Sequence, residues 1–119
     1  MKLKHDCIRE VLLVIESDLN LNNVLDNEDL EHAIKDFSHE DIEYTVKQLA
    51  GEGYIDAEFY MDGYFVKHMN FSGHNLLDDV RDVEVWKQTK DKASKISSVS
   101  IPVIQHIASS VINKMLGLQ

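Results

Sequence analysis

This 119-residue sequence has little cysteine, which small extracellular domains use for disulfides, and few basic residues, which proteins that bind polyanions need. Its single cysteine, Cys7, cannot form a disulfide within the chain, which favours a reducing cytoplasm. Twelve Lys and Arg residues face twenty-one Asp and Glu residues, giving a formal net charge of −9. A surface that binds duplex DNA needs basic residues along the path of the phosphates, so this balance argues against that function.

Long apolar runs are also scarce. The run that follows the first two lysines covers only residues 11–15, has acids on both sides and precedes no small-residue cleavage site, so we expect no signal peptide. The longest stretch without Asp, Glu, Lys or Arg is residues 96–113, and eight of its side chains are Ser, Gln, His or Asn. We therefore expect no membrane span and a cytoplasmic protein.

The motifs of common enzyme and metal sites are missing, including HExxH, paired CxxC, the P-loop and the dinucleotide fingerprint. Acid–base catalysis needs carboxylates that converge in a cleft, but Asp79 is predicted to point away from Asp78 and Asp82 on one helix. Three groups have ligand-type residues without a ligand spacing: His32, Asp36 and His39; His5, Asp6 and Cys7; and His74 with Asp78. We predict no enzyme activity, no cofactor and no metal.

What is present predicts an α+β, mostly helical chain. Apolar residues recur at helical spacing in residues 4–18, 28–37 and 38–52, with Asn27 and Ser38 as N-caps and Gly53 as a C-terminal stop. Apolar and polar residues alternate over residues 54–60, which predicts a strand. Asp62-Gly63 indicates a hairpin turn, and residues 64–69 are predicted to form the second, antiparallel strand. With a short strand at residues 22–25, this order predicts a winged helix-turn-helix with a two- to three-stranded antiparallel wing and a C-terminal helical extension.

After the wing, Asn70 is predicted to cap a fourth helix that reaches about Lys95. Ser100 then caps a last helix, residues 101–116, with Pro102 tolerated in its first turn. This gives a winged-helix domain at residues 1–95 and an amphipathic helix at residues 96–119. Steps of three and four place one apolar seam on that helix: Ile101, Ile104, Ala108, Val111 and Met115. The seam packs either on the chain's own core or on a dimer mate.

Residues 69–78, MNFSGHNLLD, carry a resemblance to an uncharacterised domain family of bacteria and their prophages. Its members begin with a basic start and an aliphatic helix, as residues 1–16 do, and have a Gly-Tyr-Ile step like Gly53-Tyr54-Ile55. After the wing they show Leu-Thr-x-x-Gly-His-x-Phe-Leu-Asp, from which this sequence departs at Asn70 and Leu76. Further similar patterns cover residues 80–90 and 100–109. The resemblance implies a winged-helix core and no established activity.

The residues of the third predicted helix do not suit the usual task of that position, which is to enter the major groove of DNA. Residues 26–62 contain twelve acids and only two bases. Because tyrosine is enriched at interfaces, we predict a non-enzymatic interaction or regulatory protein that binds a protein partner through an acidic, Tyr-flanked surface. The predicted surface comprises Glu40, Glu43, Tyr44, Lys47, Tyr60 and Tyr64.

The alternative is a DNA-binding transcriptional regulator that uses a separate basic arm. From residue 85 to the end, five lysines accompany one acid. The arm would contact phosphates through Lys87, Lys90, Lys92 and Lys95.

Overall fold

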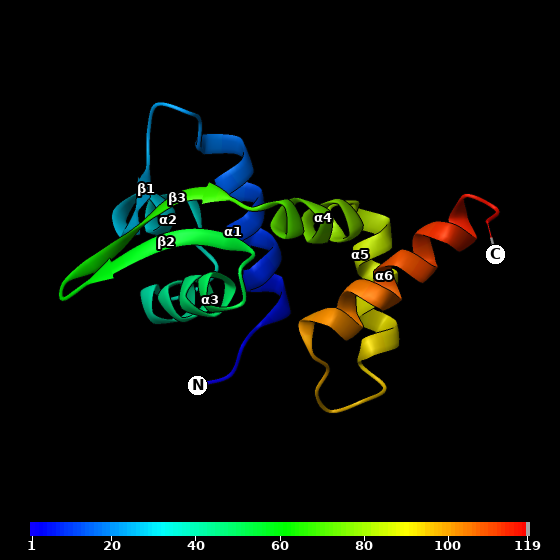
Figure 1. Cartoon of the computed structure of the whole chain (residues 1–119). Coiled ribbons are helices and arrows are strands. Elements are labelled where there is room, and N and C mark those ends of the chain that lie inside the picture. The colour runs from blue at the N-terminus through cyan, green and yellow to red at the C-terminus, as the bar shows by residue number, and fades with distance from the viewer. Residues whose placement is uncertain (119) are drawn as a thin grey trace. The chain divides into compact units, whose positions relative to one another are not determined.

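In a computed structural model that describes residues 1–118, the chain forms the predicted order of helices and strands, except that two helices stand where one long fourth helix was predicted. Six helices and a three-stranded antiparallel sheet give an α+β fold among these residues (Figure 1). The elements are α1 (His5–Asp18), β1 (Leu25–Asp26), α2 (Asn27–Ala33), α3 (His39–Gly51), β2 (Ile55–Tyr60), β3 (Gly63–Met69), α4 (Phe71–Val80), α5 (Val83–Ala93) and α6 (Ile101–Met115). The chain divides into two compact units, Met1–His74 and a second that begins at Asn75.

The first unit has the element order of a winged helix, and its helices and sheet share one buried core. The stripe of α1 that includes Val11 and Leu12 is buried, as are Ile42 and Leu49 of α3 and Val66 of β3. The helices thus cover one face of the sheet, and each buried aliphatic side chain contributes roughly 1.5–3 kcal/mol. Figure 1 shows the β2–β3 hairpin as a long ribbon with α3 running along it.

The sheet has the strand order β1-β3-β2. Tyr60 pairs with Gly63, so the hairpin loop is Met61 and Asp62. A Cβ atom at Gly63 would lie 2.5 Å from Oδ1 of Asn27, which also accepts the N–H of Tyr64 at 3.5 Å. The φ of Gly63 is not positive, so a side chain here would conflict with the Asn27 amide and would have to displace it from the N–H of Tyr64.

Both predicted ends of the third helix are confirmed. The Ser38 side chain accepts a hydrogen bond from the N–H of Asp41. Gly53 has φ 81°, and the N–H groups of Gly53 and Tyr54 donate to the carbonyls of Ala50 and Leu49, which is the Schellman ending.

The second helix differs from its prediction. Asp26 is the N-cap and forms a capping box with Asp29, so Asn27 is the first helical residue. Its helix ends at Ala33, and Ala33 is exposed whereas Ile34 is buried. The capping box at Asp26 thus moved the start of α2 one residue towards the N-terminus, and the predicted end at Phe37 is wrong, because the helix ends at Ala33.

The predicted long fourth helix is wrong, because the chain breaks between α4 and α5. Asp82 is extended (ψ 131°), and its carboxylate accepts the N–H of Val85 at 2.9 Å. Aspartate favours such a cap over a helix interior because its short side chain competes for backbone N–H groups. In the second unit, α5 and α6 pack against each other.

The start of α4 lies against the β2–β3 hairpin. The carbonyl of Tyr54 accepts the N–H of Asn70, and the Gly53 carbonyl accepts from the side chains of Asn70 and Ser72. A Cβ at Gly73 would lie only 2.2 Å from the Tyr54 carbonyl oxygen. Only glycine lets the helix approach this closely.

Among residues 1–118, no helix combines the length and the apolar character that crossing a bilayer requires.

Candidate functional site

The outward face of α3 carries the acidic residues that the sequence predicts for it. Glu40 and Lys47 are exposed, and Glu43 and Tyr44 are partly exposed. The Lys47 ammonium lies 5.7 Å from the ring centroid of Phe59 on β2, in a cation–π contact. We call the set Glu40, Glu43, Tyr44, Lys47 and Phe59 the acidic face.

Two tyrosines of the predicted surface lie elsewhere. Since successive strand residues point to opposite faces of a sheet, Tyr60 points away from the side on which Phe59 meets Lys47. Tyr60 packs instead on Phe65, with ring centroids 6.1 Å apart, and remains exposed. Tyr64 is only 1% exposed, so it is a core residue, and its assignment to the surface is wrong.

The buried Tyr64 hydroxyl has no hydrogen-bond partner among the described residues. Burial raises the pKa of this phenol well above its usual value, and the nearby carboxylates of Glu31 and Glu43 raise it further. The ring of Tyr64 packs against that of Phe59, with centroids 5.6 Å apart, so a core residue contacts a residue of the acidic face.

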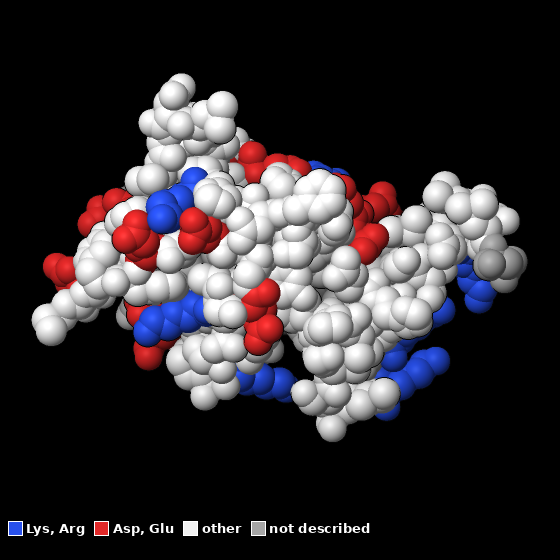
Figure 2. All heavy atoms as spheres, viewed as in Figure 1, with Lys and Arg blue, Asp and Glu red and all other residues white. Residues whose placement is uncertain are grey.

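The two basic side chains on β3 are already paired with acids of β2. Lys67 Nζ lies 3.2 Å from Glu58 and 3.7 Å from Asp56, and His68 Nε2 lies 3.7 Å from Asp56. Hydrogen bonding to Glu58 raises the pKa of Lys67, so it is charged at neutral pH. Figure 2 shows this mixture of red and blue atoms on the unit, with acidic atoms in excess.

The predicted basic arm is on the surface of the second unit. Its residues, Lys87, Lys90, Lys92 and Lys95, are all exposed. Lys90 lies 5.9 Å from the Trp86 ring centroid. In Figure 2 the blue atoms of this unit gather along its lower right edge. The structure thus leaves the four side chains on the surface.

The predicted seam of α6 divides into two parts. Ile101, Ile104, Ala108 and Val111 are buried within the single chain. Met115 is 52% exposed and lies beyond the buried segment. Burial within one chain favours internal packing for the first four positions. Sedimentation at high micromolar concentration decides between the two predictions, since an internal stripe gives a monomer and a dimer seam does not.

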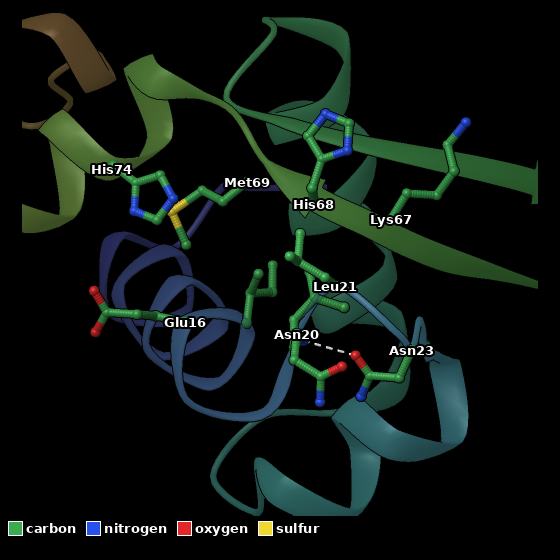
Figure 3. Close-up of a pocket in the computed structure, with 10 residues that line it drawn as sticks. Glu16, Asn20, Leu21, Asn23, Lys67, His68, Met69 and His74 are labelled. Carbon is green, nitrogen blue, oxygen red and sulfur yellow. Dashed lines mark hydrogen bonds between the residues drawn. The ribbon is translucent and has the colours of Figure 1, made fainter.

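A groove of about 510 Å³ lies in the first unit between the end of α1, the loop that follows it and the end of β3 (Figure 3). Its walls are Ile15, Glu16, Leu19, Asn20, Leu21, Asn23, Lys67, His68, Met69 and His74. Figure 3 shows the imidazoles of His68 and His74 on the sheet side and Leu21 on the loop side. This groove has no local sequence signal, because its walls come from segments some 45 residues apart.

Asparagine side chains hold the loop at this groove in place. Asn23 Oδ1 accepts the N–H of Asn20 at 2.7 Å, and Asn20 Oδ1 accepts the N–H of Asn22 at 2.8 Å. The Asn23 amide donates to the Asp18 carbonyl at 3.0 Å. These hydrogen bonds hold the backbone on both sides of Leu21, whose side chain is fully exposed.

The ligand-type residues noted in the sequence do not assemble. Within residues 1–118, no group of three or more His, Cys, Asp or Glu side chains is arranged to hold a metal ion. Cys7 is buried, and its Sγ accepts a hydrogen bond from Thr45 Oγ1 at 3.3 Å. Burial raises the pKa of this thiol, which makes it a poor nucleophile at neutral pH.

Comparisons with known proteins agree with the resemblance read from residues 69–78. A protein of Haemophilus influenzae (strain Rd), described as an uncharacterized protein, is 31% identical over 122 residues, which cover 98% of this chain and all of the relative. No solved structure matches the chain significantly. A family profile described as "Hypothetical protein (DUF2513)" matches residues 2–100. The chain therefore belongs to the DUF2513 family.

Proposed function

We propose that this chain is a non-enzymatic cytoplasmic protein that binds a protein partner through the acidic face and the adjoining hairpin tip. The observation that carries the proposal is that the lysines of α3 and of the hairpin are engaged within the fold. Lys47 lies over Phe59, and Lys67 is held between Asp56 and Glu58. Each would have to leave its contact before it could meet a phosphate.

The surface beside these contacts has the composition of an interface. Phe59 is partly exposed, and the hairpin tip exposes Tyr60 and Met61. Aromatic and Met side chains are enriched at protein interfaces, where they supply apolar area. The neighbouring carboxylates Glu40 and Glu43 complement a partner with a basic rim, which increases the rate of encounter and the specificity.

A photo-crosslinking amino acid in place of Tyr44 tests the proposal directly in cells of the source organism. We expect a discrete covalent adduct with one protein, and we expect Glu40→Lys with Glu43→Lys to remove it. The same photo-crosslinker at Ser110, an exposed position on α6, serves as the control. An adduct pattern that is identical at both positions would contradict the proposal.

The second candidate function is DNA binding through the basic arm, favoured by the exposure of its four lysines, although Lys90 makes a contact with Trp86 like that of Lys47 with Phe59. Titration of labelled duplex DNA at several salt concentrations tests it. If these lysines contact phosphates, the slope of log K against log salt falls by roughly one for each lysine removed. Steep, salt-sensitive binding that is lost in the Lys87→Glu, Lys90→Glu, Lys92→Glu variant would favour this function over the first.

A further inference from the structure

We propose that the groove beside β3 binds an extended peptide segment of a partner protein, which pairs as a strand with residues 67–69 and packs an apolar side chain against Leu21. The inference goes beyond the proposed function because its residues lie outside the acidic face and the hairpin tip. It would stand if that surface bound nothing.

The first support is the unpaired edge of the sheet. β1 has two residues, and they pair only with Val66 and Phe65 of β3. No described strand continues along the same edge of β3 past Val66, where Lys67, His68 and Met69 line the groove. A strand edge without a partner offers backbone N–H and C=O groups, and addition of an extended peptide is a recurrent way to satisfy them.

The second support is the braced loop on the opposite wall. Three hydrogen bonds of Asn20 and Asn23 fix its backbone, yet the side chain at its apex, Leu21, is fully exposed. Figure 3 shows Leu21 facing the space below His68. An apolar side chain held rigidly in water loses little conformational freedom on binding, which is the character of a preorganised contact.

The third support concerns the chemistry of the occupant. Ile15, Leu19 and Met69 line the groove with apolar atoms, which suits an apolar side chain of the peptide. The first unit also contains sixteen acids and six bases, counted over residues 1–74. In the groove itself the charged wall residues are Glu16 and Lys67, and Lys67 is already paired with Asp56 and Glu58. The acidic excess of the surrounding unit therefore favours a peptide that carries Lys or Arg beside its apolar residues.

The charge at this edge also favours a different protein over a second copy of this chain. The register shifts at Asp56/Ala57 leave Lys67 as an extra residue in β3. A lysine at an edge disfavours the pairing of two copies, because each copy brings its own lysine to the contact, whereas the bulge acts alike on any added strand. A peptide without a lysine opposite Lys67 meets no such repulsion.

Selection of a displayed library of random nine-residue peptides on the full chain tests this inference. We expect enriched peptides that alternate apolar and polar residues and include a base. A synthetic consensus peptide, measured by fluorescence anisotropy, should bind the Leu21→Ser variant about tenfold or more weakly, because one buried leucine contact is lost. N-methylation along the peptide should abolish binding at every second residue only, since strand pairing alternates.

Met61→Ser is the matched control, because Met61 is an equally exposed apolar residue in a loop of the same unit. It belongs to the hairpin tip, so it should weaken the proposed partner binding and leave the consensus peptide unaffected. The inference is overturned if no peptide is enriched, if Leu21→Ser binds as tightly as the wild type, or if N-methylation shows no alternation. A Leu21-dependent dimer of the chain alone would equally overturn it.

Discussion

Replacing Gly73 by alanine is the sharpest test of how the wing meets α4. An ideal Cβ at this position would lie 2.2 Å from the Tyr54 carbonyl oxygen and 2.6 Å from Met69 Cγ, whereas real Cβ contacts essentially never fall below 3.0 Å. The carbonyl cannot turn away without loss, because it accepts the N–H of Asn70 at 2.9 Å. The helix must therefore shift away from the strand.

The magnitude follows from three effects of different sign. Overpacking costs about 1–3 kcal/mol, and loss of the Asn70–Tyr54 hydrogen bond adds roughly 0.5–1.5 kcal/mol. The preference of a helix for alanine over glycine returns at most about 1 kcal/mol. The clash wins, and we expect the free energy of unfolding to fall by about 1–3 kcal/mol.

Urea unfolding followed by far-ultraviolet circular dichroism measures the change, and a loss of about 2 kcal/mol lowers the midpoint by roughly 1 M. Gly51→Ala is the matched control, because nothing lies within 4 Å of its added Cβ at the end of α3. That variant should be more stable than the wild type by about 0.5–1 kcal/mol. A Gly73→Ala protein that unfolds at or above the wild-type midpoint would refute the reasoning.

Three further changes have defined outcomes. Tyr64→Phe removes a buried hydroxyl without a partner among the described residues, so we expect the free energy of unfolding in urea to be unchanged or higher by up to about 1 kcal/mol. Because the pKa of the phenol is raised in the folded state, wild-type stability should fall as the pH rises past the unfolded value near 10, and this alkaline loss should shrink in the variant. Asp82→Ala removes the cap that accepts from Val85 and should cost about 0.5–2 kcal/mol, measured by thermal unfolding. Lys4→Met removes the 2.9 Å ion pair that lowers the pKa of Asp41. An NMR titration should show that the pKa of Asp41 rises towards 3.8. In the wild type the ion pair contributes stability above pH 3.8 that is lost as the pH falls, so the stability of the variant should be less sensitive to acid.

Short-range signals explain most of what the sequence predicted correctly. Ser38 and Gly53 act on backbone groups within a few residues, so the start and the end of α3 could be read directly. The errors in the helix boundaries were also local. Asp26 and Asp82 each accept a hydrogen bond from an N–H three residues ahead. The cap at Asp26 replaced the predicted cap at Asn27, and the cap at Asp82 interrupted an apolar pattern that continued past it. Aspartates before a helical pattern carried the signal that would have placed these ends.

The sequence by itself determined the class of fold and most of the order of the elements, because these depend on periodicity, caps and turns along the chain. The family followed from the resemblance of residues 69–78 and the patterns around them to known sequences. Only the tertiary structure decided what lies on the surface. The pattern of apolar and polar residues along β3 does not predict that Tyr64 is in the core or that Lys67 forms an ion pair with an acid of the neighbouring strand. The groove at Leu21 likewise depends on β1 being too short to cover β3, which is a property of strand pairing across some 40 residues. Contacts between distant segments set burial and charge pairing, and these are what a binding surface is made of.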